Sequence, residues 1–331
     1  MMKGIGNFVV AAAVCACAVG AQAGIIETVP VGNPGNAADL GWGSVGYTYN
    51  IGKYEVTAGQ YTEFLNAVAA TDPYGLYSTF MWTRSYGCQI QRSGSPGSYR
   101  YSVASDWANR PVNYVNWADA ARFSNWLANG QPTGAQGPAT TEDGSYLLSG
   151  AMTDAELMAM TRKPDATWVI PTEDEWYKAA YHKNDGVTGN YWGYPTGTNS
   201  VPSHHLIYPD PGNNATFYDY LSGGYTIGFP YYRTEVGAHE NSDSPYGTFD
   251  QGGNVWEWNE GVLDGSYRGL RGGSWDGPFV GANTLHAWTT MGAYPTYEDY
   301  TAGFRVSEVP EPATIALLAL GGVGVLARRR R

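Results

Sequence analysis

Three segments of the chain have the spacing of apolar residues that is typical of an amphipathic helix. In the first segment, Thr57 and Gln60 have the spacing of a capping box. The apolar residues that follow recur every three or four positions: Tyr61, Phe64, Leu65 and Val68. This period places them on one face of a helix. The pattern therefore predicts an amphipathic helix that begins after Thr57.

Two more helices are predicted from the same kind of signal. The second begins at Asn116, with Asp119 in its first turn. The third begins after Thr172, which has capping-box spacing to Glu175. The residues expected to face inward are Trp117, Ala120, Ala121 and Ser124 in the second helix and Trp176, Ala179 and Ala180 in the third.

The remaining apolar pieces in the middle of the chain are short. Residues 47–51 and 168–170 are examples, and both lie among turns rich in Gly, Pro, Asn and Ser. Between residues 24 and 309 there is no charged linker, no convincing repeat and no apolar run long enough to cross a membrane. The sequence therefore predicts one α+β domain over residues 24–309, with few helices and many irregular loops.

The first 23 residues have the layout of a secretory signal peptide. One charge, Lys3, precedes an apolar run over residues 8–18, and Ala21-Gln22-Ala23 closes the segment. The run is too short to span a membrane. We therefore expect export, with cleavage before Gly24. A lipoprotein acylated at Cys17 is the alternative, although the residues before Cys17 match a lipidation box poorly.

The other end of the chain is a second processing segment, over residues 310–331. Pro310-Glu311-Pro312 is followed by fifteen uncharged residues and then by four arginines at the terminus. A helix of that length reaches about 22 Å, whereas the hydrocarbon core is about 30 Å thick. This segment resembles a PEP-CTERM sorting signal. The resemblance implies transient membrane association, processing by an exosortase, and a final location in the Gram-negative envelope, at the surface or in the extracellular matrix.

Removing both terminal segments leaves an acidic domain. The formal net charge of the full chain is −11, and the loss of Lys3, Glu311 and four arginines brings it to about −15. An acidic surface repels nucleic-acid phosphates and anionic lipid headgroups, so neither is an expected partner. Cations and neutral glycans suit it better.

The domain has a single thiol, because Cys15 and Cys17 lie in the signal segment and only Cys88 remains. No intrachain disulfide can form within residues 24–309. A lone cysteine in an exported domain is more often buried and inert than reactive.

Several motifs in the domain resemble those of the formylglycine-generating enzyme, or sulfatase-modifying factor, family. They cover residues 47–306 in the order that the family has them. The motifs are YNIGKYEVT (49–57), PVNYVNW (111–117), IPTEDEW (170–176), GNVWEW (253–258), LRGGSW (270–275) and GFRV (303–306). The resemblance implies a loop-rich variant of the C-type lectin fold.

The same resemblance implies a structural calcium ion around the GNVWEW motif. Its ligands would be Asp250, the main-chain carbonyls of Gly253 and Val255, and Glu257. Carboxylate and carbonyl oxygens are the ligands that Ca²⁺ prefers. In the alternative, Glu257 pairs with Arg271 or Arg305 in the core and Asp250 caps a turn. A second calcium site of the family, near Asn214 and Ala215, stays open.

The oxidase activity of the family needs a copper-binding cysteine pair, which this sequence lacks. The corresponding places fall at about Gly277 and Ala282, which carry no thiol. Cu(I) is soft and prefers thiolates, so no copper is expected. We also find no histidine pattern suited to an iron site, and no catalytic residue is predicted.

The segment from Trp275 to Tyr300 is the candidate ligand surface, because the family builds its substrate groove there. The predicted contacts are Trp275, Asp276, Asn283, His286 and Trp288, with Phe279, Tyr294 and Tyr297 as further aromatic residues. The alternative is that these aromatic residues fill the core.

The leading hypothesis is a noncatalytic, calcium-stabilised binding or structural module with a glycan, peptide or matrix ligand. An enzyme of the same superfamily with altered chemistry is the alternative. The residues argue against formylglycine formation.

Overall fold

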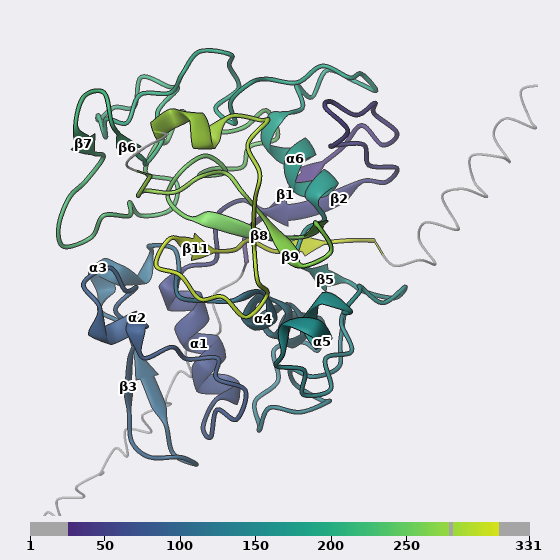
Figure 1. The fold of residues 1–331 in the computed structure, drawn as a ribbon, viewed down its shortest axis with the longest axis vertical. Helices are drawn as coiled ribbons and strands as arrows, with labels where there is room; N and C mark the ends of the chain where they lie inside the picture. Colours follow the sequence, from purple (N-terminus) through teal and green to yellow (C-terminus); the bar gives the residue numbers. More distant parts are fainter. Residues whose placement is uncertain (1–25, 278–280, 311–331) are drawn as a thin grey trace, which may run out of the picture.

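A computed structural model describes residues 26–277 and 281–310 of the chain. The predicted signal peptide, Phe279 and all but the first residue of the predicted sorting segment lie outside the described residues. None of the helices in the described residues has the length and hydrophobicity of a membrane span. The model is an α+β structure with few helices and long loops, as predicted (Figure 1).

The three predicted helices form at the predicted positions. They are α1 (Ala58–Val68), α4 (Trp117–Ala128) and α6 (Glu173–Tyr181), and each begins with a capping box. In α1, Gln60 N–H donates to Thr57 Oγ1, and Thr57 N–H donates to the Gln60 side chain. These bonds satisfy backbone N–H groups that have no partner inside a helix.

Four shorter helical segments were not predicted. They are α2 (Phe80–Thr83), α3 (Ser105–Ala108), α5 (Asp154–Met158) and the 3₁₀ segment η1 (Gly281–Leu285).

Two four-stranded sheets organise the domain. The first has the order β1 (Thr28–Val31), β2 (Tyr49–Gly52), β12 (Ser307–Glu308), β5 (Trp168–Val169), with all neighbours antiparallel. The second has the order β10 (Met291–Ala293), β9 (Tyr267–Arg271), β8 (Trp256–Leu263), β11 (Ala302–Gly303). Only the β11–β8 pair of the second sheet is parallel.

Two small hairpins complete the strands. They are β3 (Gln91–Ser93) with β4 (Arg100–Ser102), and β6 (Tyr218–Asp219) with β7 (Gly224–Tyr225). Between α6 and β8 the chain has only β6 and β7, so most of that stretch is loop, which Figure 1 shows in teal and green at the top of the view.

Aromatic side chains join the helices to the second sheet. The Phe64 ring on α1 lies 5.2 Å from both Phe123 and Trp126 on α4, measured between ring centroids. Phe304, just after β11, packs on Phe123 at 5.4 Å. All four side chains are buried. The main core therefore lies between α1, α4 and the strands at the centre of Figure 1.

Hydrogen bonds hold the long loops, which have no disulfide to do so. The carboxylate of Asp210 accepts from Gly212 N–H and Asn214 Nδ2 in its own loop, and from Asn241 N–H and Ser242 Oγ in a later one. One buried carboxylate thus joins two loops. The four donors satisfy the Asp210 carboxylate, and none of them is a positively charged side chain.

Candidate functional site

The turn that carries the GNVWEW motif is held by residues in the left-handed backbone region. Asp250, Gly253 and Asn254 have φ values of 58°, 90° and 60°. A Cβ at Gly253 would lie 2.2 Å from the carbonyl oxygen of Thr216. Only glycine fits that position, and the tight turn feeds directly into β8.

A buried ion pair lies at the start of β8. Arg305 donates from Nε to Glu257 Oε2 and from a terminal nitrogen to Glu257 Oε1, both at 2.6 Å. Trp176 Nε1 also donates to Glu257 Oε2, at 2.7 Å. Arg305 further donates to the carbonyl oxygens of Gly52 and Phe249. Four of the motifs named above therefore meet at one bidentate pair with no exposed atoms on either side chain.

The other predicted arginine partner of Glu257 lies elsewhere. Arg271 donates from Nε to Glu173 Oε1 at 2.9 Å and reaches the carbonyl oxygens of Ala287 and Thr289. Of the two ion pairs that the sequence left open for Glu257, the structure contains the one with Arg305.

Two more carboxylates lie close to this ion pair. Glu55 accepts from Asn254 Nδ2 and Val255 N–H, and Asp250 Oδ2 accepts from Gly237 N–H at 2.6 Å. Burial raises the pKa of Asp250 to about 6, and the nearby Glu257 adds to the rise. Burial also raises the pKa of Glu55 well above its ordinary value. Of the three carboxylates, only Glu257 forms an ion pair with Arg305.

The fit of calcium to this turn is incomplete. Glu257 has both oxygens engaged by Arg305 and Trp176, so it could bind an ion only by sharing an oxygen with them. Among the described residues, no three His, Cys, Asp or Glu side chains form a group that could hold a metal ion. Asp250, by contrast, accepts its hydrogen bond from Gly237 N–H at Oδ2. Calcium at this turn stays a prediction, and the cluster of three carboxylates, only one of which pairs with an arginine, is the feature that favours it.

Trp275 is the centre of an aromatic cluster, which we call the Trp275 cluster. Its ring is 1% exposed. The distances from its centroid to those of the surrounding rings are 4.8 Å for Tyr232, 5.5 Å for Tyr86, and 5.7 Å for both Tyr225 and Tyr300. Tyr86 and Tyr225 are each 39% exposed. Trp275 therefore supports a surface that the tyrosines present to solvent.

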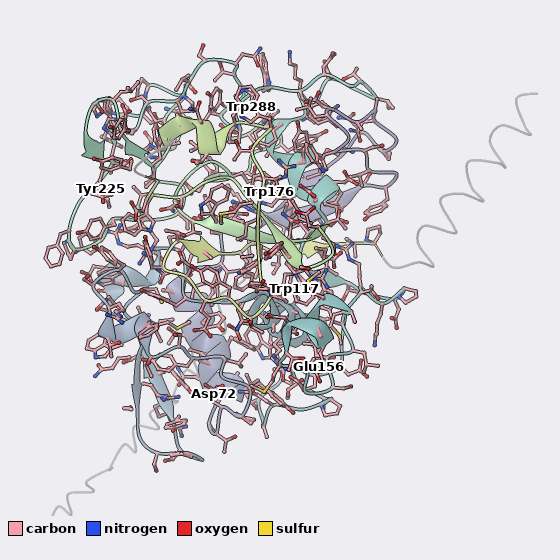
Figure 2. All side chains as sticks on the ribbon, in the orientation of Figure 1. Asp72, Trp117, Glu156, Trp176, Tyr225 and Trp288 are labelled. Atoms are coloured by element: carbon pink, nitrogen blue, oxygen red, sulfur yellow. The ribbon has the colours of Figure 1, made fainter. Side chains whose placement is uncertain are left out.

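The predicted ligand residues separate into groups. Asp276 belongs with the Trp275 cluster, since Tyr300 donates its hydroxyl to Asp276 Oδ2 at 3.0 Å. His286 instead stacks on Trp288 with ring centroids 3.4 Å apart, and Asn283 is exposed on η1. In Figure 2, Trp288 lies at the top of the view and Tyr225 at the left.

Sequence reasoning missed Tyr86, Tyr225 and Tyr232, because they lie far from residues 275–300 along the chain. The only feature of the sequence that pointed to them as site residues was that they are tyrosines.

The single thiol of the domain, Cys88, is linked to the Trp275 cluster through Asn113. Cys88 is fully buried, and its Sγ is 3.9 Å from the carbonyl oxygen of Asn113. Asn113 Nδ2 in turn donates to the carbonyl oxygens of Tyr86 and Tyr300. Burial raises the pKa of the Cys88 thiol, which disfavours the reactive thiolate. Ala282, predicted from the sequence to lie near one of the family's cysteine positions, is half-buried in η1.

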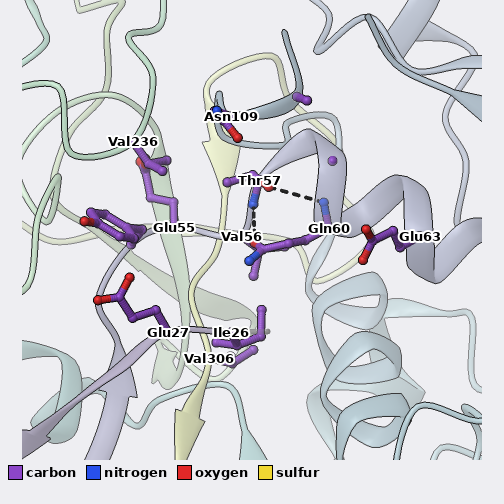
Figure 3. A pocket seen from close by; sticks show the side chains of 13 residues that line it. Ile26, Glu27, Glu55, Val56, Thr57, Gln60, Glu63, Asn109, Val236 and Val306 are labelled. Atoms are coloured by element: carbon purple, nitrogen blue, oxygen red, sulfur yellow. Dashed lines mark hydrogen bonds between the residues drawn. The ribbon is translucent and has the colours of Figure 1, made fainter. Parts of the chain in front are cut away.

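A cavity of about 420 Å³ lies at the start of α1. Figure 3 shows Glu27, Glu55 and Glu63 around it, beside the capping hydrogen bonds of Thr57 and Gln60. None of the predicted site residues lines it. The cavity is acidic, and we assign it no role.

Two protein-family models match this chain. Residues 44–309 match the model of the sulfatase-modifying factor enzyme 1-like domain, and residues 308–331 match the PEP-CTERM protein-sorting motif. The second match indicates export and sorting to the cell envelope or surface, with recognition by the exosortase machinery. A comparison with curated protein sequences gives no match.

Two solved structures share the fold. The crystal structure of CarF is 18% identical, with a TM-score of 0.51, and the alignment covers 87% of this chain and 99% of CarF. The variable protein 1 of Treponema denticola is 20% identical, with a TM-score of 0.50, over 86% of this chain and 95% of that protein. At these identities the likeness shows the fold alone.

Proposed function

We propose a binding role without catalysis for this chain, which belongs to the family of sulfatase-modifying factor enzyme 1-like domains. In this proposal the protein is exported, processed at its PEP-CTERM segment, and displayed at the envelope or released into the extracellular matrix. There it would bind a ligand through the Trp275 cluster.

The observation that carries the proposal is the lack of a cysteine pair that could bind copper in the domain. Gly277 and Ala282 stand near the places of the family's cysteine pair, and neither side chain can bind copper. Cys88 is fully buried and has no second thiol among residues 24–309. A two-thiolate copper site therefore has no ligands in this domain.

An oxidation assay tests whether the copper-dependent reaction of the family is absent. The purified protein, with and without added Cu(I), is incubated aerobically with a cysteine-containing peptide, and the peptide mass is followed. We expect no conversion of cysteine to formylglycine. A copper-dependent conversion would reject the proposal.

The shape of the Trp275 cluster supports the binding role. Four tyrosines surround one buried indole, and two of them are 39% exposed. Tyrosines combine an apolar ring with a hydroxyl, so they suit a ligand that is partly apolar and partly polar, such as a glycan or a peptide. The Asp276 carboxylate beside Tyr300 adds a hydrogen-bond acceptor.

Paired alanine variants test this surface. A glycan array and a pull-down from envelope matrix are performed with the native protein, with Tyr225→Ala and with Trp288→Ala. Both variants remove an exposed aromatic ring, but Trp288 lies outside the Trp275 cluster. We expect Tyr225→Ala to lose captured ligand and Trp288→Ala to keep it. Equal losses, or no capture by the native protein, would count against the surface.

We also propose a structural calcium ion at the turn before β8. Asp250 and the carbonyl oxygens of Gly253 and Val255 would supply ligands, with Glu257 sharing an oxygen. The cluster of the Glu55, Asp250 and Glu257 carboxylates, of which only Glu257 pairs with an arginine, supports the proposal. An ion that binds only the folded state raises the unfolding temperature.

The calcium test is a thermal shift with calcium and with a chelator. We expect calcium to raise the midpoint of the native protein and Asp250→Ala to abolish the rise. An unchanged midpoint in the native protein would remove calcium from this account and leave the binding role in place.

A further inference from the structure

A groove of about 350 Å³ lies on the second sheet, beside β10. Its floor is apolar: Leu270 on β9 is directly opposite Met291 on β10, and Trp256 lies at the start of β8. Ala293 and Ala302 complete the floor with small side chains. The volume is at the lower end of the range for small-molecule sites, about 300–1000 Å³, and suits a single ring.

Three tyrosines form the walls of the groove. The rings of Tyr267 and Tyr294 lie 4.9 Å apart at 53°. Tyr294 is 49% exposed and Tyr297 is 48% exposed. A Cβ at Gly292 would lie 2.8 Å from the Cβ of Tyr267, so glycine at this position makes room for the Tyr267 side chain beside β10.

A carboxylate lies at the polar end of the groove. Asp299 Oδ2 accepts from the Tyr297 hydroxyl at 2.9 Å, and Asp299 Oδ1 accepts from Thr301 N–H at 2.8 Å and from the Thr301 hydroxyl. These bonds hold the carboxylate in place and leave it lone pairs for further donors. Asp299 is the one charged residue among the described residues that line the groove.

The groove and the Trp275 cluster lie on either side of one segment. Asp299 and Thr301 line the groove, whereas Tyr300 between them packs against Trp275. The two surfaces share no residue, so substitutions can separate them.

We propose that this groove binds the pyranose ring of a neutral sugar. A pyranose presents one apolar C–H face, which stacks on an aromatic ring, and hydroxyl groups, which donate to a carboxylate. The tyrosine walls and Asp299 offer both kinds of contact. The negative charge of Asp299, in a domain that is acidic overall, disfavours anionic sugars. The site is separate from the proposed ligand surface at the Trp275 cluster and does not depend on it.

The probes are three methyl pyranosides, those of glucose, galactose and mannose, with methyl glucuronide as the anionic comparison. N-acetylphenylalaninamide represents an aromatic peptide side chain. Binding of each to the purified protein is measured by saturation-transfer NMR and titration. We expect at least one neutral pyranoside to bind, and the glucuronide and the amide to bind more weakly.

Three variants locate the binding. Tyr294→Ala removes one wall and is expected to weaken pyranoside binding about tenfold, the equivalent of about 1.4 kcal/mol. Asp299→Asn keeps the shape but removes the charge, and is expected to weaken the neutral pyranoside and strengthen the glucuronide. Trp82→Ala, which removes an exposed aromatic ring on α2 outside the groove, is the control and should bind as the native protein does.

Clear outcomes would overturn the proposal. They are no binding of any neutral pyranoside, unchanged binding in Tyr294→Ala, or tighter binding of the amide than of every sugar. Unfolding midpoints of the variants show whether each is folded. If Tyr294→Ala does not fold, Tyr297→Phe, which removes only the hydroxyl that donates to Asp299, takes its place and should also weaken binding. The losses caused by Tyr294→Ala and Asp299→Asn should persist in the Tyr225→Ala background, which separates this groove from the Trp275 cluster.

Discussion

The buried Glu257–Arg305 pair gives the sharpest stability prediction. Glu257→Gln keeps the size of the side chain but removes its charge, so the fully buried guanidinium of Arg305 loses its bidentate partner. Removing one partner of a buried ion pair costs about 3–5 kcal/mol. For a domain of this size, 1 kcal/mol corresponds to roughly 2–4 °C. We therefore expect the midpoint of thermal unfolding to fall by roughly 6–20 °C.

The matched control is an ion pair at the surface. Glu27 pairs with Lys53 at 2.8 Å, but the two side chains are 59% and 27% exposed. Exposed pairs contribute little, so Glu27→Gln should shift the midpoint by less than about 2 °C. The unfolding midpoints of the native protein, Glu257→Gln and Glu27→Gln are measured by differential scanning calorimetry at pH 7. Equal midpoints for Glu257→Gln and Glu27→Gln would refute the reasoning, because the charge pair would then not hold the four motifs together.

Three further predictions concern His239, Gly253 and Cys88. Burial lowers the pKa of His239 to about 4, whereas the unfolded chain titrates near 6.5, so its contribution is complete above pH 6.5 and is lost as the pH falls toward 4. The free energies of unfolding of the native protein and of His239→Asn are measured with urea at several pH values. Their difference should change by roughly 3 kcal/mol across this window. A difference that stays constant would contradict the lowered pKa of His239. In the same assay, Gly253→Ala should lower the free energy of unfolding by roughly 1–3 kcal/mol more than Gly265→Ala, because a Cβ at Gly265 meets no atom within 4 Å. Equal losses would show that the turn at Gly253 can shift to accept a Cβ. The Cys88 thiol should react with Ellman's reagent only as fast as the protein unfolds, and rapid labelling of the native protein would show that the thiol is accessible.

Local signals in the sequence predicted the three main helices. Thr57 and Thr172 form the capping boxes that their spacing indicates, and Asn116, the predicted start of the second helix, forms one with Asp119. The short helix α5 carries the same signal, from Thr153 to Glu156, and could have been found. Helices α2 and α3 have no side-chain cap, so their positions depend on packing that the sequence does not display.

The candidate site was only partly predictable, because it depends on contacts between distant parts of the chain. The sequence indicated that Glu257 would bind either calcium or an arginine, but the choice of Arg305 comes from the pairing of β11 with β8. The Trp275 cluster shows the same limit. Trp275 and Asp276 were identified, yet Tyr86 and Tyr225, which supply exposed rings, come from separate loops and hairpins.

The groove beside β10 also needed the structure. Tyr294 and Tyr297 were identified as aromatic residues of the ligand segment, but Tyr267 lies on the neighbouring strand and closes the wall only through the β9–β10 pairing. Register between strands decides which side chains share a face, and short strands such as β10 give little sequence pattern from which to read it.

The most direct test of the central claim is mass spectrometry of a cysteine-containing peptide after incubation with the purified protein, Cu(I) and oxygen. The account predicts that the peptide is unchanged, because Gly277 and Ala282 offer no thiolate and Cys88 is buried. Formylglycine in the peptide, formed by the native protein and lost in Cys88→Ser, would contradict the claim that this domain binds without catalysing.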